Sequence, residues 1–184
     1  MIRILAISGS LRSASSNTSL VRAATKLAPD SVEIIIYGGL ADLPHFSPDL
    51  DEEARALHSV GGFRRQLQMS DGVLISSPEY AHGVPGALKN ALDWLVGSGE
   101  MVNKPVALIN ASTRATHAQA SLTEILTTMA ASVVADASIT VPLDGRKLDE
   151  AGIIHDPEAS GLLRSSIVAL VGAIEGKRSE SGNG

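Results

Sequence analysis

The chain of 184 residues has no cysteine, which excludes disulfide bonds, thiolate nucleophiles and metal sites built on cysteine. A cysteine-free chain also fits a reducing compartment. Basic residues are in the minority, with 15 lysines and arginines against 20 aspartates and glutamates and a formal net charge of −5. That balance argues against a nucleic-acid partner, because such proteins carry a clustered basic face. It is also less acidic than we expect of a dedicated electron carrier that docks through charge.

Targeting signals and long apolar runs are lacking as well. Met1 is followed directly by the strand-like residues 2–7, without the longer apolar core and cleavage site of a signal peptide. No apolar run reaches the length that spans a bilayer, and no internal repeat is present. We therefore expect a cytoplasmic protein without a membrane partner.

What the chain does contain is an alternation of short apolar runs and helical patterns. The apolar runs predict strands at residues 3–8, 32–37, 73–77 and 106–110, with a fifth, interrupted strand at 133–134 and 139–141. Apolar residues recur at helical spacing near residues 18–28, 51–69, 87–96, 117–131 and 157–175. Asn17 directly precedes the first of these segments and is predicted to be its N-cap. This alternation predicts an α/β fold, a doubly wound five-stranded parallel sheet with helices on both faces.

The length favours a single domain, which we place at residues 1–176. Residues 177–184 have no apolar anchor and are predicted to form a disordered tail. Doubly wound sheets bind ligands beyond the carboxyl ends of their strands. The chemistry is therefore expected in the loops at 8–17, 77–86 and 110–117.

The first of these loops has the composition of an anion site. Residues 8–17 read Ser-Gly-Ser-Leu-Arg-Ser-Ala-Ser-Ser-Asn, between a predicted strand and a predicted helix. Hydroxyl and backbone N–H groups at a helix start favour a phosphate, and Arg12 adds a planar charged fork. The loop has neither the G-x-G-x-x-G pattern nor a Walker A lysine, so it predicts a mononucleotide phosphate. The alternative is a solvated serine-rich turn that Asn17 caps.

The second loop has the features of a rigid wall for a flat ring. Residues 77–94 read Ser-Pro-Glu-Tyr-Ala-His-Gly-Val-Pro-Gly-Ala-Leu-Lys-Asn-Ala-Leu-Asp-Trp. The prolines at 78 and 85 restrict the backbone, and Gly83 permits a close backbone approach. Tyr80 can lie over or beside a ring. Residues 77–86 are therefore predicted to form one side of a site for a flat ring.

Together the two loops resemble the NADPH-dependent FMN reductase family, whose motifs are close to Gly-Ser-x-Arg-x-x-Ser-x-Asn and Pro-Glu-Tyr-Asn-x-Ser/Gly-x-Pro-Gly-x-Leu-Lys-Asn-Ala-x-Asp-Trp. The order and separation of the motifs also match, over about residues 3–175. The resemblance implies a flavodoxin-like fold, bound FMN, NAD(P)H as co-substrate, and a homodimer or homotetramer. For the FMN phosphate it implies Ser10, Arg12, Ser16 and Asn17. For the isoalloxazine ring it implies Pro78, Glu79, Tyr80 and Gly83.

Two departures from the family pattern stand out. The asparagine that follows the tyrosine in the family is Ala81 here, with His82 next. Many relatives carry Ser-x-Gly-x-x-Gly after the fourth strand, whereas residues 111–117 contain no glycine. We expect Ser112 of this loop to contact the cofactor, and Arg114 is a candidate for a phosphate of NAD(P)H or for the ring's pyrimidine end. The histidines have no metal-binding spacing, and neither a metal ligand nor a catalytic side chain is predicted.

The expected function is transfer of a hydride from NAD(P)H through bound FMN to a small acceptor, such as a quinone, an azo compound, a metal ion or free flavin. In such enzymes the protein supplies orientation and backbone hydrogen bonds, while the cofactor supplies the reactive group. NADH and NADPH both stay open as the donor. Two alternatives also stay open, a flavodoxin-type electron carrier without NAD(P)H oxidase activity and a flavin-free interaction module on the same fold.

Overall fold

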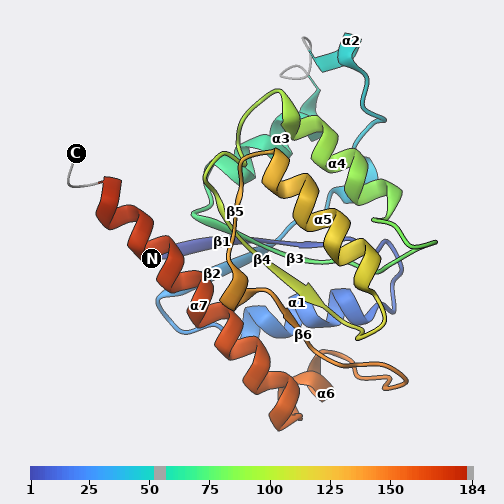
Figure 1. Ribbon diagram of the computed structural model, residues 1–184, viewed down its shortest axis with the longest axis vertical. Helices are drawn as coiled ribbons and strands as arrows, with labels where there is room; N and C mark the ends of the chain where they lie inside the picture. Colours follow the sequence, from blue (N-terminus) through green and yellow to red (C-terminus); the bar gives the residue numbers. More distant parts are fainter. Residues whose placement is uncertain (52–56, 182–184) are drawn as a thin grey trace.

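The computed structural model describes residues 1–51 and 57–181, which form a parallel sheet between two layers of helices (Figure 1). Neighbouring strands follow the order β2-β1-β3-β4-β5, and β6 pairs with β4 beyond the end of β5. Every pairing is parallel, which confirms the predicted flavodoxin-like, doubly wound architecture. The strands are β1 (Ile2–Ser8), β2 (Val32–Ile36), β3 (Gly72–Ser76), β4 (Pro105–Asn110), β5 (Ser132–Val133) and β6 (Ile139–Thr140).

The central strands are apolar along their whole length because helices cover both faces of the sheet. All residues of β3 and β4 are buried. One face packs against α1, α6 and α7, and the other against α3, α4 and α5. The helical segments are α1 (Ser16–Leu27), η1 (Leu40–Asp42), α2 (Pro48–Asp51), α3 (His58–Gln68), α4 (Gly86–Val96), α5 (Thr116–Thr128), η2 (Ala135–Ala137), α6 (Glu150–His155) and α7 (Pro157–Ser181).

The predicted helix over 51–69 begins later than expected. In the structure α3 starts at His58 and runs through Gly61 and Gly62 without a break. Its buried residues Val60, Phe63 and Leu67 recur at helical spacing, so one apolar stripe faces the sheet. Residues 52–56 of the predicted helix lie outside the described residues.

The fifth strand is split in two, as the polar interruption in its sequence indicated. β5 pairs with Pro105 and Val106, whereas β6 pairs with Ile109 and Asn110. The short helix η2 lies between them, and the Ser138 hydroxyl accepts a hydrogen bond from the Leu108 N–H at 3.2 Å. A side-chain acceptor thus replaces the backbone acceptor that a continuous strand would offer.

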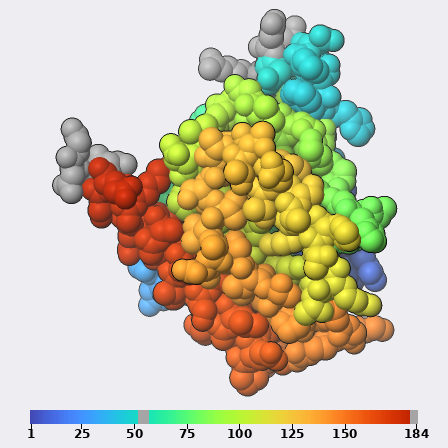
Figure 2. Space-filling view, in the orientation of Figure 1, coloured from blue at the N-terminus to red at the C-terminus, as the bar shows by residue number. Residues whose placement is uncertain are grey.

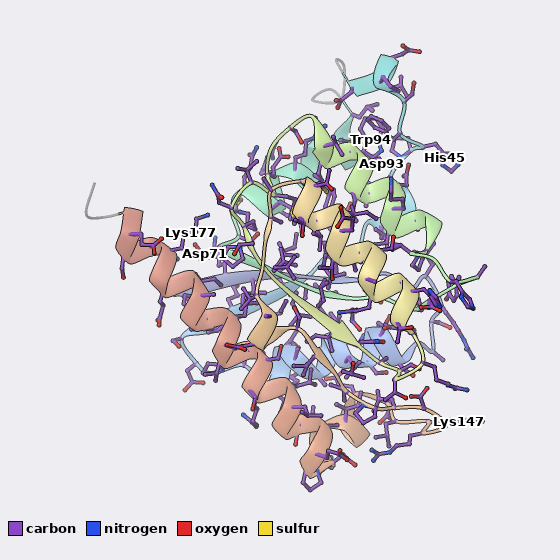
Figure 3. The ribbon with its side chains drawn as sticks, in the orientation of Figure 1. His45, Asp71, Asp93, Trp94, Lys147 and Lys177 are labelled. Carbon is purple, nitrogen blue, oxygen red and sulfur yellow. The ribbon has the colours of Figure 1, made fainter. Side chains whose placement is uncertain are left out.

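Helix α7 continues past the end of the domain expected at residue 176. It runs to Ser181, so residues 177–181 are helical where a disordered tail was predicted, and residues 182–184 lie outside the described part. Lys177 donates to the Asn103 carbonyl at 2.6 Å, and Arg178 pairs with Asp71 at 2.7 Å. Figure 3 shows Lys177 and Asp71 beside this end of α7. Two cationic side chains therefore attach a segment that has no apolar anchor.

By length and composition alone, residues 157–180 of α7 could cross a membrane, although the sequence reading found no run of that length. The helix nevertheless presents an apolar stripe to the sheet. Leu163, Ile167 and Leu170 are buried in the core shared with α1 and β4, while Val168 on the opposite side is 65% exposed. This one-sided burial is the pattern of a core helix that covers a sheet.

Candidate functional site

The loops that follow β1, β3, β4 and β6 meet at the carboxyl edge of the sheet and enclose a cleft of about 620 Å³. The three loops predicted from sequence all contribute to it. Of the predicted cofactor residues, the cleft is lined by Ser16, Asn17, Pro78, Glu79 and Ser112. The structure therefore brings together side chains that lie far apart in the sequence, at the edge where this fold class binds its ligands.

The N-terminus of α1 opens onto one end of this cleft. Ser15, with φ −110° and ψ 130°, is the N-cap, and its hydroxyl accepts from the Thr18 N–H at 3.5 Å. Asn17, which was predicted to be the cap, instead lies in the first turn and is 6% exposed. Its Oδ1 accepts from the Ser76 hydroxyl at 2.9 Å, which ties α1 to the end of β3. The prediction of the cap was wrong because Ser15 is the residue with extended backbone.

Ser10 and Arg12 lie beside the cleft rather than in its lining. Ser10 is 8% exposed, and its hydroxyl accepts from the Arg12 N–H at 3.2 Å. Arg12 lines an adjoining cavity of about 850 Å³, which shares Ser16, Arg146 and Lys147 with the first. Arg12 therefore belongs to the lining of the adjoining cavity and does not line the cleft itself.

The loop after β3 contains a tight hairpin turn. Tyr80 and Gly83 exchange backbone hydrogen bonds of 3.1 and 3.0 Å, while Ala81 and His82 have φ of 49° and 60°. Positive φ at both central residues defines a type I′ turn, which asparagine and glycine adopt most readily. The family's asparagine therefore suits the position, and Ala81 adopts a conformation that costs a residue with a Cβ about 1–2 kcal/mol. Tyr80 is 55% exposed.

Gly83 is not required by the fold itself. A Cβ at this position would meet only the Tyr80 carbonyl oxygen, at an ordinary contact distance of 3.6 Å. Gly9 differs, since a Cβ there would lie 2.8 Å from the Ser77 hydroxyl and 3.0 Å from Leu88. The close packing of the first two loops thus depends on glycine at 9 and not on glycine at 83.

Glu79 joins the loop after β3 to the helix after β4. Its Oε2 accepts from the Ala118 N–H at 2.8 Å, in the first turn of α5. The N-cap residue of that helix, Ala115, has no side chain that could accept such a bond. A carboxylate at a helix N-terminus is also favoured by the helix dipole. Glu79 therefore acts as a cap supplied from another segment and fixes one wall of the cleft.

The glycine-free loop 111–117 is shaped by side-chain hydrogen bonds. Asn110 is 6% exposed, donates to the Ala115 carbonyl at 3.0 Å and accepts from the Ser112 N–H at 3.1 Å. All residues of this loop are described, and none of them has a positive φ. The loop therefore does without glycine because its backbone stays in ordinary conformations.

Asp144, which the sequence motifs did not predict, also lines the cleft. Its carboxylate accepts from the Ser112 hydroxyl at 2.5 Å and from the Thr113 N–H and hydroxyl at 2.9 and 3.1 Å. Arg114 adds Nε and Nη2 contacts of 3.3 and 3.2 Å. The hydrogen bond from Ser112, followed by that from the Thr113 N–H, lowers the pKa of Asp144 to about 2.

Arg146 and Lys147, on the same loop after β6, also line the cleft. Figure 2 shows this loop, in orange, against the yellow segment that leads into α5, and Figure 3 shows Lys147 on the loop's outer edge. The Asp-Gly pair at 144–145, after the predicted strand residues 139–141, is a turn signal that could have pointed to this fourth loop.

The rings of His82 and His117 lie 4.3 Å apart between centroids, at an angle of 32°. This contact adds a second link between the loops after β3 and β4. Within residues 1–51 and 57–181, no three histidine, aspartate or glutamate side chains are grouped as a metal site would require.

Comparison with known proteins places these features in a family. A family model described as NADPH-dependent FMN reductase matches residues 2–145. An NAD(P)H-dependent FMN reductase of Pseudomonas aeruginosa is 31% identical over 177 residues, covering 92% of this chain and 93% of that protein. A quinone reductase of Escherichia coli K12 is 35% identical over 113 residues, which span 60% of each protein.

Solved structures give a consistent result. The flavoenzyme FerB of Paracoccus denitrificans, an NAD(P)H:(acceptor) oxidoreductase, superposes with a TM-score of 0.75 at 28% identity. The match covers 95% of this chain and 98% of FerB. An azoreductase of Bacillus anthracis, at 16% identity and a TM-score of 0.58, shares the fold.

Proposed function

The chain belongs to the NADPH-dependent FMN reductase family, and from this premise we propose that it binds FMN in the cleft and uses NAD(P)H to reduce a small acceptor. The observation that carries the proposal is the convergence of an open helix N-terminus and three rigid loops on one cleft. A volume of about 620 Å³ lies within the range of about 300–1,000 Å³ typical of cofactor and ligand sites.

The donors in the cleft fit a flavin phosphate. The first N–H groups of α1 lack partners within the helix, as at every helix start, and attract an anion. We propose that Ser10, Arg12, Ser16 and Asn17 hold the phosphate, with Arg12 approaching from the adjoining cavity. Asn17 acts mainly through its backbone and by fixing α1, because its side chain is bonded to Ser76.

A planar ring would lie against the loops after β3 and β4, where Pro78, Glu79 and Ser112 line the cleft whereas Tyr80 and Gly83 do not. We propose that Pro78, Glu79, Tyr80, Gly83 and Ser112 surround it. Glu79 and Ser112 do so as parts of a hydrogen-bonded frame, since each already has a partner in the protein. Bound FMN would supply the capacity to accept a hydride and pass electrons on, which no side chain here has. The chain's residues orient the reactants and hold backbone donors in place, and we assign no catalytic acid or base.

The acceptor class follows from the relatives' names. Several are quinone reductases, and we propose a quinone ahead of an azo compound, a metal ion or free flavin. We also propose a homodimer or homotetramer. Tyr80 and Leu11, which are 55% and 60% exposed, are apolar side chains on the loops after β3 and β1 that a second copy could cover. The cytoplasmic location stays a prediction.

The test is the visible spectrum of the purified protein with added FMN, before and after anaerobic NADPH or NADH. We expect flavin that co-purifies through gel filtration and loses its absorbance with at least one nicotinamide. Retained flavin that responds to neither would support an electron carrier, and failure to retain flavin would support a flavin-free module. Arg12→Ala should weaken FMN binding at least tenfold, whereas Arg65→Ala on α3 is the matched control. Equal FMN affinity in the two variants would contradict the phosphate assignment.

A further inference from the structure

The groups that surround the Asp144 carboxylate are those that proteins use to bind phosphate. They comprise the hydroxyls of Ser112 and Thr113, the Thr113 N–H, and the guanidinium fork of Arg114. Hydroxyls and a backbone N–H combined with an arginine fork form a typical oxyanion site. Here the anion belongs to the chain itself.

The backbone of the loop does not depend on Asp144 for its shape. Asn110 bonds both ends of the segment 112–115, and Glu79 bonds the first turn of α5. The Leu143 N–H also donates to the Ala111 carbonyl at 3.1 Å. The side chain of Arg114 is 82% exposed and makes its contacts with Asp144 from the solvent side. The donors around Asp144 would therefore stay in position if the carboxylate left them.

We propose that Thr113 and Arg114 bind a phosphate group of the nicotinamide dinucleotide, and that the Asp144 carboxylate occupies the same donors when that phosphate is absent. This inference rests on the proposed function, because it assigns a subsite to the hydride donor. The donors border the cleft itself, since Arg114 and Asp144 both line it. The ligand phosphate and the carboxylate compete for one set of hydrogen bonds.

Asp144 can vacate the site without unfolding its loop. Its backbone is bonded through Leu143 on one side, while Gly145 on the other side is exposed and has φ 72°. Rotation of the Asp144 side chain alone would free the donors. Lys147 also lines the cleft, whereas Arg146 is paired with Asp156. When the Asp144 carboxylate turns away, the cleft therefore loses a negative charge while Lys147 and Arg114 remain. An internal competitor lowers the apparent affinity for the ligand by the fraction of time that it occupies the site.

The experiment measures binding of nucleotide fragments to the purified protein by titration calorimetry. Adenosine 2′,5′-bisphosphate carries the phosphate that distinguishes NADPH, and ADP carries the pyrophosphate common to both nicotinamides. The variants are Asp144→Asn, which keeps the shape and removes the charge, Arg114→Gln, and the double variant. Glu33→Gln is the matched control, because Glu33 is also paired with an arginine, at 2.9 Å on the exposed edge strand β2.

We expect Asp144→Asn to bind a fragment about tenfold more tightly than the parent, and Arg114→Gln to bind it about tenfold more weakly. The double variant should resemble Arg114→Gln, and Glu33→Gln the parent. A gain confined to the 2′,5′-bisphosphate identifies the 2′-phosphate, and a gain for both fragments identifies the pyrophosphate. Unchanged or weaker binding in Asp144→Asn, or an equal gain in Glu33→Gln, would overturn the proposal.

Two further outcomes separate this inference from the proposed function. An Asp144→Asn effect on FMN affinity, without any effect on either fragment, would assign the donors to the flavin and overturn the subsite. The expected changes in fragment affinity could also appear in a protein whose bound flavin does not respond to NADPH or NADH. That result would support the phosphate subsite and refute the reductase activity.

Discussion

The loops after β3 and β4 form neighbouring walls of the cleft, and they keep their shapes by opposite means. The turn at 80–83 relies on backbone geometry, with Ala81 and His82 at positive φ. The loop at 111–117 relies on a side chain, because the Asn110 amide bonds both ends of the segment 112–115. A turn of the first kind depends on which residue tolerates the left-handed region, whereas a loop of the second kind can lose its glycines as long as its partners remain.

Removing the buried side-chain amide of Asn110 should destabilise the loop at 111–117 and have the largest of these effects. We expect Asn110→Ala to lower the free energy of unfolding by about 2 kcal/mol, because the Ala115 carbonyl and the Ser112 N–H lose their partner together. Asn110→Asp keeps an acceptor for Ser112 but has no donor for Ala115, so its loss should be intermediate. Urea denaturation measures both, and equal stability of Asn110→Ala and the parent would contradict the side-chain account.

The hydrogen bond from the Ala118 N–H to Glu79, which links the two loops, should contribute less to the free energy of unfolding. Glu79→Ala removes the acceptor of the Ala118 N–H and should cost about 1 kcal/mol, as loss of a helix cap does. Glu79→Gln retains an acceptor and should cost less. Glu124→Ala, an exposed glutamate of the same helix, is the control and should leave the unfolding midpoint nearly unchanged. A Glu79→Ala midpoint that equals the control would show that α5 needs no cap from this loop.

The strained turn should gain stability from substitution. Ala81→Asn and Ala81→Gly are expected to raise the free energy of unfolding by about 0.5–1 kcal/mol, because both residues adopt positive φ more readily than alanine. Gly83→Ala is the comparison within the same turn, and it should be nearly neutral because space for a Cβ exists there. Thermal unfolding of the three variants tests the contrast, which would fail if Ala81→Gly lowered the midpoint.

The smallest expected effect is the response of the second loop to acid. The pKa of Asp144 is lowered from 3.8 to about 2, so the native state binds its proton less readily than the unfolded chain. Its stabilising contribution is therefore fully present above about pH 4 and is lost as the pH falls toward 2. Asp144→Asn should show a shallower loss of stability between pH 4 and pH 2, measured by urea denaturation. Identical slopes in variant and parent would rule out this contribution.

The candidate site was predictable where it follows from local patterns. The serine-rich segment at 8–17 and the motif at 77–94 are contiguous in sequence, and the alternation of strands and helices placed both at the carboxyl edge of the sheet. The cap of α1 was missed by two residues because serine and asparagine are both good caps, and only backbone conformation distinguishes them. The helical continuation to Ser181 was missed because its anchors, Asn103 and Asp71, lie on distant segments.

The sequence by itself determined the class of fold, the parallel sheet and the segments that line the cleft, because apolar periodicity and short motifs are local properties of the chain. Only the tertiary structure decided which side chains meet across that cleft. Asp144 bonds Ser112, Glu79 bonds Ala118 and Asn17 bonds Ser76, over separations of 32, 39 and 59 residues. Such pairs depend on the order of the strands in the sheet, which no local pattern of residues encodes.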